Sequence, residues 1–283
     1  MQSYFTEQDS AEIVNRRMGV DIEGRLAEVM SCLVDHLHAF VKETQLTQDE
    51  WEFAIDFLTR TGQICSAERQ EFILLSDVLG ISMLVDAVNN RRPEGATEST
   101  VFGPFHVAGA PVRNMGDDIS LDGKGDKCLY EGKVLDIDGN PVEDARIDVW
   151  SDNSDGYYDV QQPDIQPKWN NRGIFVTGPD GAYHFIGIKP VSYPIPDDGP
   201  VGQMLEHLGR HSNRPAHMHF LITAQGYRKL VTHTFVGDDP YLASDAVFGV
   251  KEGLIAPFER SEDGSAVWRS EFDFVLVRSE ATD

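Results

Sequence analysis

Apolar residues recur at steps of three and four positions through the first third of the chain, which is the pattern of amphipathic helices. After a polar arm with a short helical pattern over 11–17, one apolar stripe runs from Leu26 to Val41. The sequence Thr47-Gln48-Asp49-Glu50 has the form of a capping box and predicts a second helix, which should end near Gly62. A third helix is predicted over 66–88.

The pattern changes at Glu94, after which Gly, Pro, Ser and Asp dominate and predict a long irregular connection over 94–126. Within it, the apolar segment Val101–Phe105 must be buried against something, and the wall of a pocket is one candidate. From Cys128 onward, short alternating runs separated by turn residues predict strands. These runs cover 129–137, 145–150, 183–188, 217–224, 229–236 and 272–277.

Short strands with frequent turns are typical of an antiparallel β-sandwich. A hydrophobic fraction of 41% is enough to build a sizeable core in a chain of this length. We therefore expect an α+β protein, with an N-terminal helical domain over 1–100 and an antiparallel β-sandwich domain over 101–283.

The charge of the chain narrows the range of partners. It has 24 basic and 47 acidic residues, a net charge of −23, which disfavours nucleic acid and anionic membranes as binding partners. The first ten residues lack a basic region followed by an apolar run, so we expect no signal peptide, and no apolar run is long enough to predict a membrane span. The three cysteines are scattered rather than arranged as a disulfide framework, which favours a cytoplasmic protein.

Two histidines in the predicted strand over 217–224 are the first candidates for chemistry. His217 and His219 are two residues apart, so on a strand their side chains point to the same face. Two adjacent imidazoles make half of a metal site, although two unrelated histidines in one strand would look the same. His36 and His38 share this spacing but lie in a predicted helix, where they would point to nearly opposite sides, so we interpret them as surface or interface residues.

Two tyrosines stand where further ligands could come from. Tyr158 follows a predicted strand closely, and Tyr193 lies in a loop that is stiffened by four prolines between positions 190 and 200. Each could equally be a packed tyrosine whose hydroxyl group reaches water. The residues alone leave both interpretations open.

Three blocks of the chain resemble the intradiol ring-cleaving dioxygenases, over about residues 25–280. The first block has the spacing of the family signature, and it consists of Tyr130-Glu131-Gly132-Lys133-Val134, Gly139, Val142, Ile147-Asp148-Val149, Gly156 and Tyr158. The second is Pro190–Tyr193 and the third is Gly209–His219. Tyr130 departs from the pattern, since the family usually has an aliphatic residue there.

The resemblance implies one Fe(III) per subunit, held by Tyr158, Tyr193, His217 and His219. Fe(III) is a hard, trivalent ion that favours anionic oxygen donors, and two phenolates would cancel two of its three charges. A ferric site of this kind is implied to activate the aromatic substrate rather than O2. The ring is then cleaved between its two hydroxyl-bearing carbons, and both atoms of O2 enter the product.

The resemblance also implies roles for three residues beside the iron. Tyr193 would leave the metal and accept a proton from the substrate. Arg214 occupies the family position that stabilises negative charge on the bound substrate, although in so acidic a chain it could be a structural ion pair. His233 stands where catechol-cleaving relatives carry a glutamine, which leaves the nature and protonation state of that hydrogen-bond donor open.

Three further stretches look most like the hydroxyquinol 1,2-dioxygenase branch of the family, and they are Phe102–Val107, Ser192–Pro196 and Asp245–Lys251. The implied substrate is benzene-1,2,4-triol and the product is 3-hydroxy-cis,cis-muconate, the enol form of maleylacetate. The implied pocket consists of Leu74, Asp77, Val101, Phe102, Gly103, Pro104, Phe105, Ile195, Pro196, Arg214 and Val247. Asp77 lies in an otherwise apolar helix, where it could bind the third substrate hydroxyl or simply cap the helix or face solvent.

For the helical domain, the resemblance implies a homodimer interface with a bound phospholipid, although the apolar stripe is equally compatible with ordinary helix packing. Catechol or a substituted catechol is the alternative substrate. Two other classes of protein also remain open. A zinc-dependent hydrolase could use the histidine pair, and a non-catalytic β-sandwich binding module would need no metal.

Overall fold

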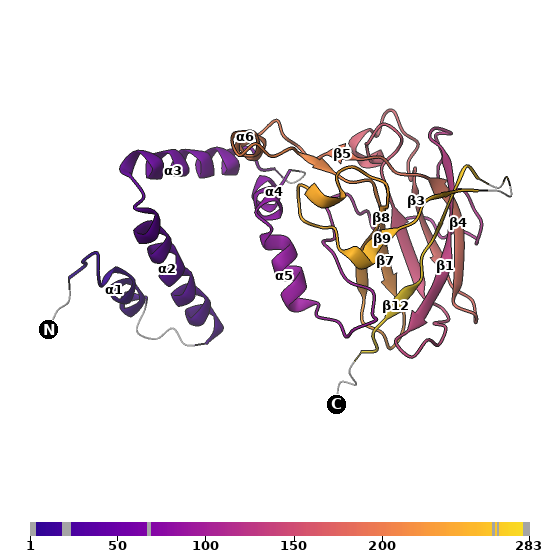
Figure 1. Cartoon of the computed structure of the whole chain (residues 1–283), viewed down its shortest axis with the longest axis horizontal. Helices are drawn as coiled ribbons and strands as arrows, with labels where there is room; N and C mark the ends of the chain where they lie inside the picture. Colours follow the sequence, from indigo (N-terminus) through magenta and orange to yellow (C-terminus); the bar gives the residue numbers. More distant parts are fainter. Residues whose placement is uncertain (1–3, 19–23, 67–68, 262–263, 265, 280–283) are drawn as a thin grey trace. The chain divides into compact units, whose positions relative to one another are not determined.

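The computed structural model describes residues 4–18, 24–66, 69–261, 264 and 266–279 (Figure 1). It combines N-terminal helices with β-sheets, so the predicted α+β class is confirmed. The chain forms two compact units, Met1–Gln63 and Ile64–Asp283. The boundary between the two compact units therefore lies after Gln63. The helices that follow Gln63 belong to the second unit.

The first unit contains α1 (Ser10–Arg17), α2 (Arg25–Thr44) and α3 (Gln48–Gln63). Hydrogen bonds join α1 to α2. The Asn15 side-chain amide donates to Asp35 Oδ1 at 2.8 Å, and His38 Nδ1 lies 2.9 Å from Ser10 Oγ. His38 is therefore a contact between two helices.

The capping box predicted before α3 is present in the structure. The Thr47 backbone N–H donates to Glu50 Oε2 at 2.9 Å, and the Glu50 backbone N–H donates to Thr47 Oγ1 at 3.3 Å. These two bonds satisfy backbone donors that the first turn of a helix would otherwise leave without partners.

The single helix predicted over 66–88 is wrong, because the structure has two helices there. They are α4 (Glu71–Val78) and α5 (Ile81–Asn89). Gly80 separates them with a φ of 74°, a left-handed conformation that glycine adopts without strain and that ends a helix. A further helix, α6 (Pro200–His207), begins with a proline at its first position and was not predicted.

The described second unit also contains two larger sheets. One contains β1 (Lys127–Asp136), β4 (Ala182–Ile188), β10 (Glu259–Arg260), β11 (Trp268–Glu271) and β12 (Phe274–Leu276). The other has the order β3 (Arg172–Val176), β2 (Arg146–Trp150), β7 (His217–Thr223), β8 (Leu230–Val236) and β9 (Ile255–Ala256). A short pair, β5 (Tyr193–Pro194) and β6 (Asn213–Arg214), stands apart, and the 3-10 helices are Asp159–Gln161, Leu242–Ser244 and Glu252–Leu254.

The expectation of antiparallel sheets is wrong at three pairings. Strand β1 is parallel to both β11 and β12, and β8 is parallel to β9. A hairpin turn always produces an antiparallel pair, but these strands are joined by long connections, which can return the chain in either direction. The predicted runs also did not include β3, β5, β6, β9, β10 and β11.

One hydrophobic cluster takes side chains from both large sheets. Tyr130 of β1 stacks on Phe185 of β4 with ring centroids 4.9 Å apart, and its hydroxyl donates to the Ile188 carbonyl at 2.7 Å. The aromatic ring at this unusual position is therefore buried with its polar group satisfied. Within the described residues, no helix is both long enough and apolar enough to cross a membrane.

Candidate metal centre

Strand β7 lies between β2 and β8, and it carries both histidines of the predicted pair. His217 and His219 are each 1% exposed, and their Nε2 atoms lie 3.2 Å apart. The alternation of a strand therefore places both imidazoles on one face, as expected.

Both candidate tyrosines reach these imidazoles. The Tyr158 hydroxyl lies 3.0 Å from His219 Nε2, and the Tyr193 hydroxyl lies 3.4 Å from His217 Nε2. The two hydroxyl oxygens are 3.2 Å apart. Four donor atoms from distant parts of the chain thus form a closed ring, which we call the donor cluster.

Local backbone structure explains how Tyr158 and Tyr193 come close to each other. Gly156 has a φ of 81° in the turn before Tyr158, and a Cβ atom there would lie 3.1 Å from Tyr193 Cβ. A side chain at position 156 would therefore push the two tyrosines apart. Tyr193 on β5 pairs directly with Arg214 on β6.

Burial keeps the isolated donor cluster neutral. Removal from water raises the pKa of Tyr158 well above its ordinary value and lowers the pKa of His217 to about 3. Burial also raises the pKa of Tyr193 and lowers that of His219. Two phenols and two neutral imidazoles form a site that a cation could occupy, because a cation would stabilise the phenolate form.

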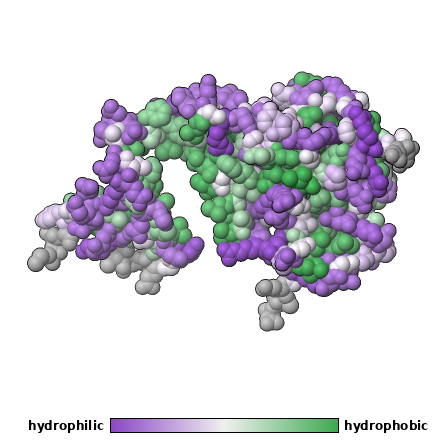
Figure 2. Space-filling view, in the orientation of Figure 1, coloured by the Kyte–Doolittle hydropathy of each residue, from purple (hydrophilic) through white to green (hydrophobic). Residues whose placement is uncertain are grey.

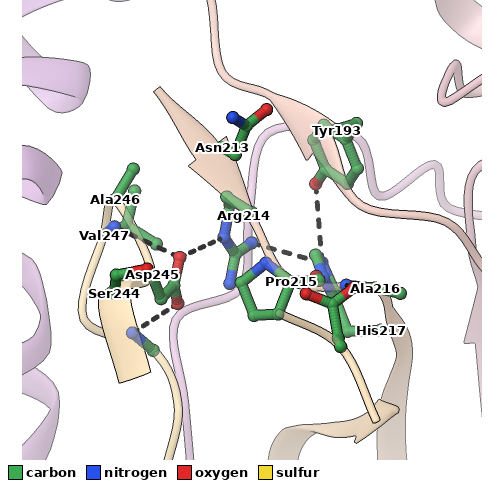
Figure 3. Close-up of polar contacts among 12 residues, drawn as sticks. Tyr193, Asn213, Arg214, Pro215, Ala216, His217, Ser244, Asp245, Ala246 and Val247 are labelled. Atoms are coloured by element: carbon green, nitrogen blue, oxygen red, sulfur yellow. Dashed lines mark hydrogen bonds and ion pairs between the residues drawn. The ribbon is translucent and has the colours of Figure 1, made fainter. Parts of the chain in front are cut away.

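Arg214 approaches the donor cluster from β6 and is 5% exposed (Figure 3). Its Nη1 atom lies 3.2 Å from His217 Nε2, while its Nε donates to Asp245 Oδ1 at 3.3 Å. The Asp245 carboxylate also accepts the backbone N–H groups of Val247 at 3.3 Å and Gly249 at 2.8 Å. Arg214 therefore makes a buried ion pair and also faces the cluster.

The Asp245 carboxylate keeps the Arg214 guanidinium group positively charged despite its burial. Burial acts to lower the pKa of Arg214, but the Asp245 carboxylate raises it above the ordinary value. Arg214 Nη2 is buried and has no hydrogen-bond partner among the described residues, so it remains available to a ligand. Asp245 was not among the predicted site residues, although it opens one of the stretches that carry the resemblance.

His233 lies beside His219 on the neighbouring strand β8. Its ring is fully buried, neither ring nitrogen has a partner among the described residues, and burial lowers its pKa well below the ordinary value. The ligand atoms of His217, His219 and His233 all lie within 4.8 Å of one another. These three histidines form a second possible donor set, of the kind that zinc accepts.

The predicted pocket residues come from five places, one of which is Arg214 on β6. Leu74 and Asp77 lie on α4, Ile195 and Pro196 follow β5, Val247 follows the 3-10 helix Leu242–Ser244, and the remaining ones are Val101, Phe102, Gly103, Pro104 and Phe105. Burial raises the pKa of Asp77, against opposing effects of a Ser82 hydrogen bond and the Arg214 charge. The positive charge of Arg214 thus partly offsets the effect of burial on the pKa of Asp77.

Comparison with known proteins identifies the family. A family model described as "Dioxygenase" matches residues 101–278, and one described as "Catechol dioxygenase N terminus" matches residues 23–97. The chain belongs to the intradiol ring-cleavage dioxygenases. A hydroxyquinol 1,2-dioxygenase of a Rhizobium species is 56% identical over 285 residues, with 97% of each chain covered.

Solved structures of intradiol dioxygenases resemble the chain over nearly its whole length. A hydroxyquinol 1,2-dioxygenase of Pseudomonas putida superposes with a TM-score of 0.93 at 46% identity, covering 96% of this chain and 99% of that one. A catechol 1,2-dioxygenase of an Acinetobacter species gives 0.80 at 28% identity, covering 99% and 95%. The similarity is thus greater to the hydroxyquinol enzyme than to the catechol enzyme.

Intradiol dioxygenases are known for non-haem iron, and the donor cluster of this chain suits that metal. Its oxygen and nitrogen donors are buried, lie 3.0–3.4 Å from their neighbours in the ring, and include two phenols that can become anionic ligands. Hard anionic oxygen is the donor type that ferric iron prefers. The residues present therefore fit the metal of the family.

Proposed function

We propose that this intradiol dioxygenase is a cytoplasmic enzyme of aromatic-compound degradation that cleaves hydroxyquinol with O2. The product is 3-hydroxy-cis,cis-muconate, the enol form of maleylacetate. One observation carries the proposal: the donor cluster of Tyr158, Tyr193, His217 and His219 occurs in a chain 56% identical to a hydroxyquinol 1,2-dioxygenase. Catechol or a substituted catechol is the alternative substrate.

We assign one Fe(III) per subunit to the donor cluster. When bound, ferric iron supplies the Lewis acidity that makes an aromatic diol reactive towards O2. Arg214, whose charge is secured by Asp245, is placed to stabilise negative charge on a substrate oxygen. The Tyr193 oxygen, 3.4 Å from His217 Nε2, would as a phenolate take up the proton that leaves a substrate hydroxyl group.

The purified protein tests this assignment through its colour and its oxygen consumption. Ferric phenolate predicts a red-brown protein with a broad visible absorption band, and one iron per subunit by elemental analysis. Oxygen uptake should be faster with hydroxyquinol than with catechol at matched concentrations. A colourless protein with full iron occupancy would refute the ligand assignment, and faster uptake with catechol would refute the substrate.

Asp77 is proposed to bind the third hydroxyl of hydroxyquinol, because it is a half-buried carboxyl group on α4 and the positive charge of Arg214 acts on its pKa. Asp77→Ala should lower kcat/KM for hydroxyquinol by roughly 10- to 100-fold, the value of a hydrogen bond to a charged group. Turnover of catechol, which lacks the third hydroxyl, serves as the control. An equal loss for both substrates would contradict this role.

The three-histidine set is the observation that favours a second candidate, a zinc-dependent hydrolase. That reading predicts a colourless protein whose metal is retained when Tyr158 is replaced. A non-catalytic β-sandwich module, the remaining alternative, predicts ligand binding that survives replacement of His217. The two sheets that share one core support the β-sandwich part of the domain over 101–283.

We also propose that residues 1–100 provide a homodimer interface with a phospholipid bound there. Helix α2 has no buried residue, and its exposed apolar side chains are Leu26, Val29, Met30, Leu33, Leu37, Phe40 and Val41. Figure 2 shows hydrophobic surface on α4 and α5 as well, where Leu84 is 65% exposed. Apolar surface of this extent favours contact with a second copy or with acyl chains.

Introducing a charge into the apolar stripe should break the proposed dimer. We expect Leu33→Glu to shift the protein to monomers in analytical ultracentrifugation, because Leu33 is 45% exposed in the single chain and would be buried in the dimer. Glu43→Arg changes a charge on the same helix outside the stripe and should leave the dimer intact. A wild-type protein that sediments as a monomer would contradict the proposal.

A further inference from the structure

Three aromatic residues occupy one register across the sheet that carries the donor cluster. Trp150 of β2 pairs with His219 of β7, which in turn pairs with His233 of β8. The Trp150 indole stacks on the His219 imidazole with centroids 4.7 Å apart and planes at 13°, while His233 meets it edge-on at 4.2 Å and 89°. His219 is therefore packed from both neighbouring strands.

The segment Phe102–His106, which we call the clamp segment, contacts two residues of the donor cluster. Gly103 has a φ of 74°, and a Cβ atom there would lie 3.1 Å from His219 Cε1. Phe105 stacks on the Tyr158 ring, with centroids 4.5 Å apart and planes at 24°. The segment therefore touches one histidine and one tyrosine of the cluster directly.

The clamp segment is itself held in place. The rings of Phe102 and His106 pack against Trp150, with centroids 5.7 Å and 4.7 Å from the indole. His106 Nε2 also lies 3.2 Å from Asp148 Oδ2 on β2. The clamp segment therefore contacts β2, the strand that also carries Trp150.

The two cluster histidines differ in what orients them. His217 Nδ1 lies 2.7 Å from the Pro215 carbonyl oxygen, which is the usual arrangement for a metal-ligating histidine. His219 Nδ1 is buried and has no hydrogen-bond partner among the described residues. On its Nδ1 side, the His219 ring is therefore held among the described residues by packing rather than by a hydrogen bond.

We propose that the clamp segment is a positioning element that orients His219 and Tyr158 by packing, in place of the hydrogen bond that orients His217. This inference rests on the proposed iron site. It gives the clamp segment a second role, the positioning of two iron ligands, besides that of lining the substrate pocket. Gly103 is required because a side chain there would displace the His219 ring. Phe105 fixes the plane of the Tyr158 ring.

The test compares two glycines with similar backbone conformations. Gly103→Ala and Gly109→Ala both place alanine at a positive φ, 74° and 86°, but a Cβ at Gly109 would have no non-neighbouring heavy atom within 4 Å. Both variants should therefore introduce similar backbone strain. Gly103→Ala alone should release iron to a chelator roughly 10- to 100-fold faster, the range found for groups that orient metal ligands, and should shift the visible band.

A second pair of variants covers the case in which Gly103→Ala does not fold. Phe105→Leu should speed iron release and shift the band, whereas Phe258→Leu, which changes a half-buried phenylalanine beside Tyr130, should do neither. Wild-type protein should bind iron and show the visible band. The clamp is then refuted if Gly103→Ala has the iron-release rate and visible band of Gly109→Ala. It is also refuted if Phe105→Leu has those of Phe258→Leu. A wild-type protein that binds no iron refutes the iron site itself, and the clamp with it.

Discussion

Tyr158→Phe is expected to remove stable iron binding and the visible absorption band from a protein that still folds. Phenylalanine fills the same space as tyrosine, and the ring at this position is fully buried, so the packing against Phe105 remains. The hydroxyl beside His219 Nε2 is lost, and with it an anionic ligand. Because changes to groups that only orient ligands cost roughly 10- to 100-fold in metal affinity, loss of a ligand should cost more.

Tyr130→Phe is the matched control, because it also removes one buried tyrosine hydroxyl, which in this case donates to the Ile188 carbonyl. It should lower the unfolding temperature slightly and leave iron content and colour unchanged. Elemental analysis and the visible spectrum of both variants measure the difference. Full metal content in Tyr158→Phe would instead favour the set of His217, His219 and His233.

The sequence predicts best where local pattern decides the structure. The capping box at Thr47 and the alternation around His217 both depend on residues a few positions apart, and both are present in the structure. Strand β3 was missed because its Arg172 reads as a surface residue. In the fold Arg172 is 1% exposed and its Nε donates to Asp159 Oδ1 at 2.6 Å, a pairing that no local pattern reveals.

Local sequence pattern also could not predict that the four candidate ligands come together in space. The alternation of a strand could place His217 and His219 on one face, but it could not bring Tyr158 and Tyr193 to them. That expectation came from the spacing of many positions in a family pattern. Asp245 escaped notice because its role depends on contact with Arg214, 31 residues away in the sequence.

Arg214→Gln is expected to lower kcat by roughly 10²- to 10³-fold, the usual effect of removing a donor that stabilises developing negative charge. Iron content should stay close to that of wild type, because Arg214 is not one of the four donors. Stopped-flow or oxygen-electrode rates, normalised to iron content, measure the effect. Arg260→Gln, which removes an exposed arginine that packs on Trp268, is the control and should keep the wild-type rate.

The Arg214→Gln variant also leaves the Asp245 carboxylate buried without its ion-pair partner, and such an isolated charge destabilises a protein by roughly 3–5 kcal/mol. The double variant Arg214→Gln with Asp245→Asn removes both charges and should recover most of that stability, as measured by urea unfolding. Its kcat should nevertheless stay as low as that of the single variant, since the proposed role of the missing charge is to stabilise the substrate. Recovery of the rate together with stability would mean that Arg214 acts only as a structural ion pair.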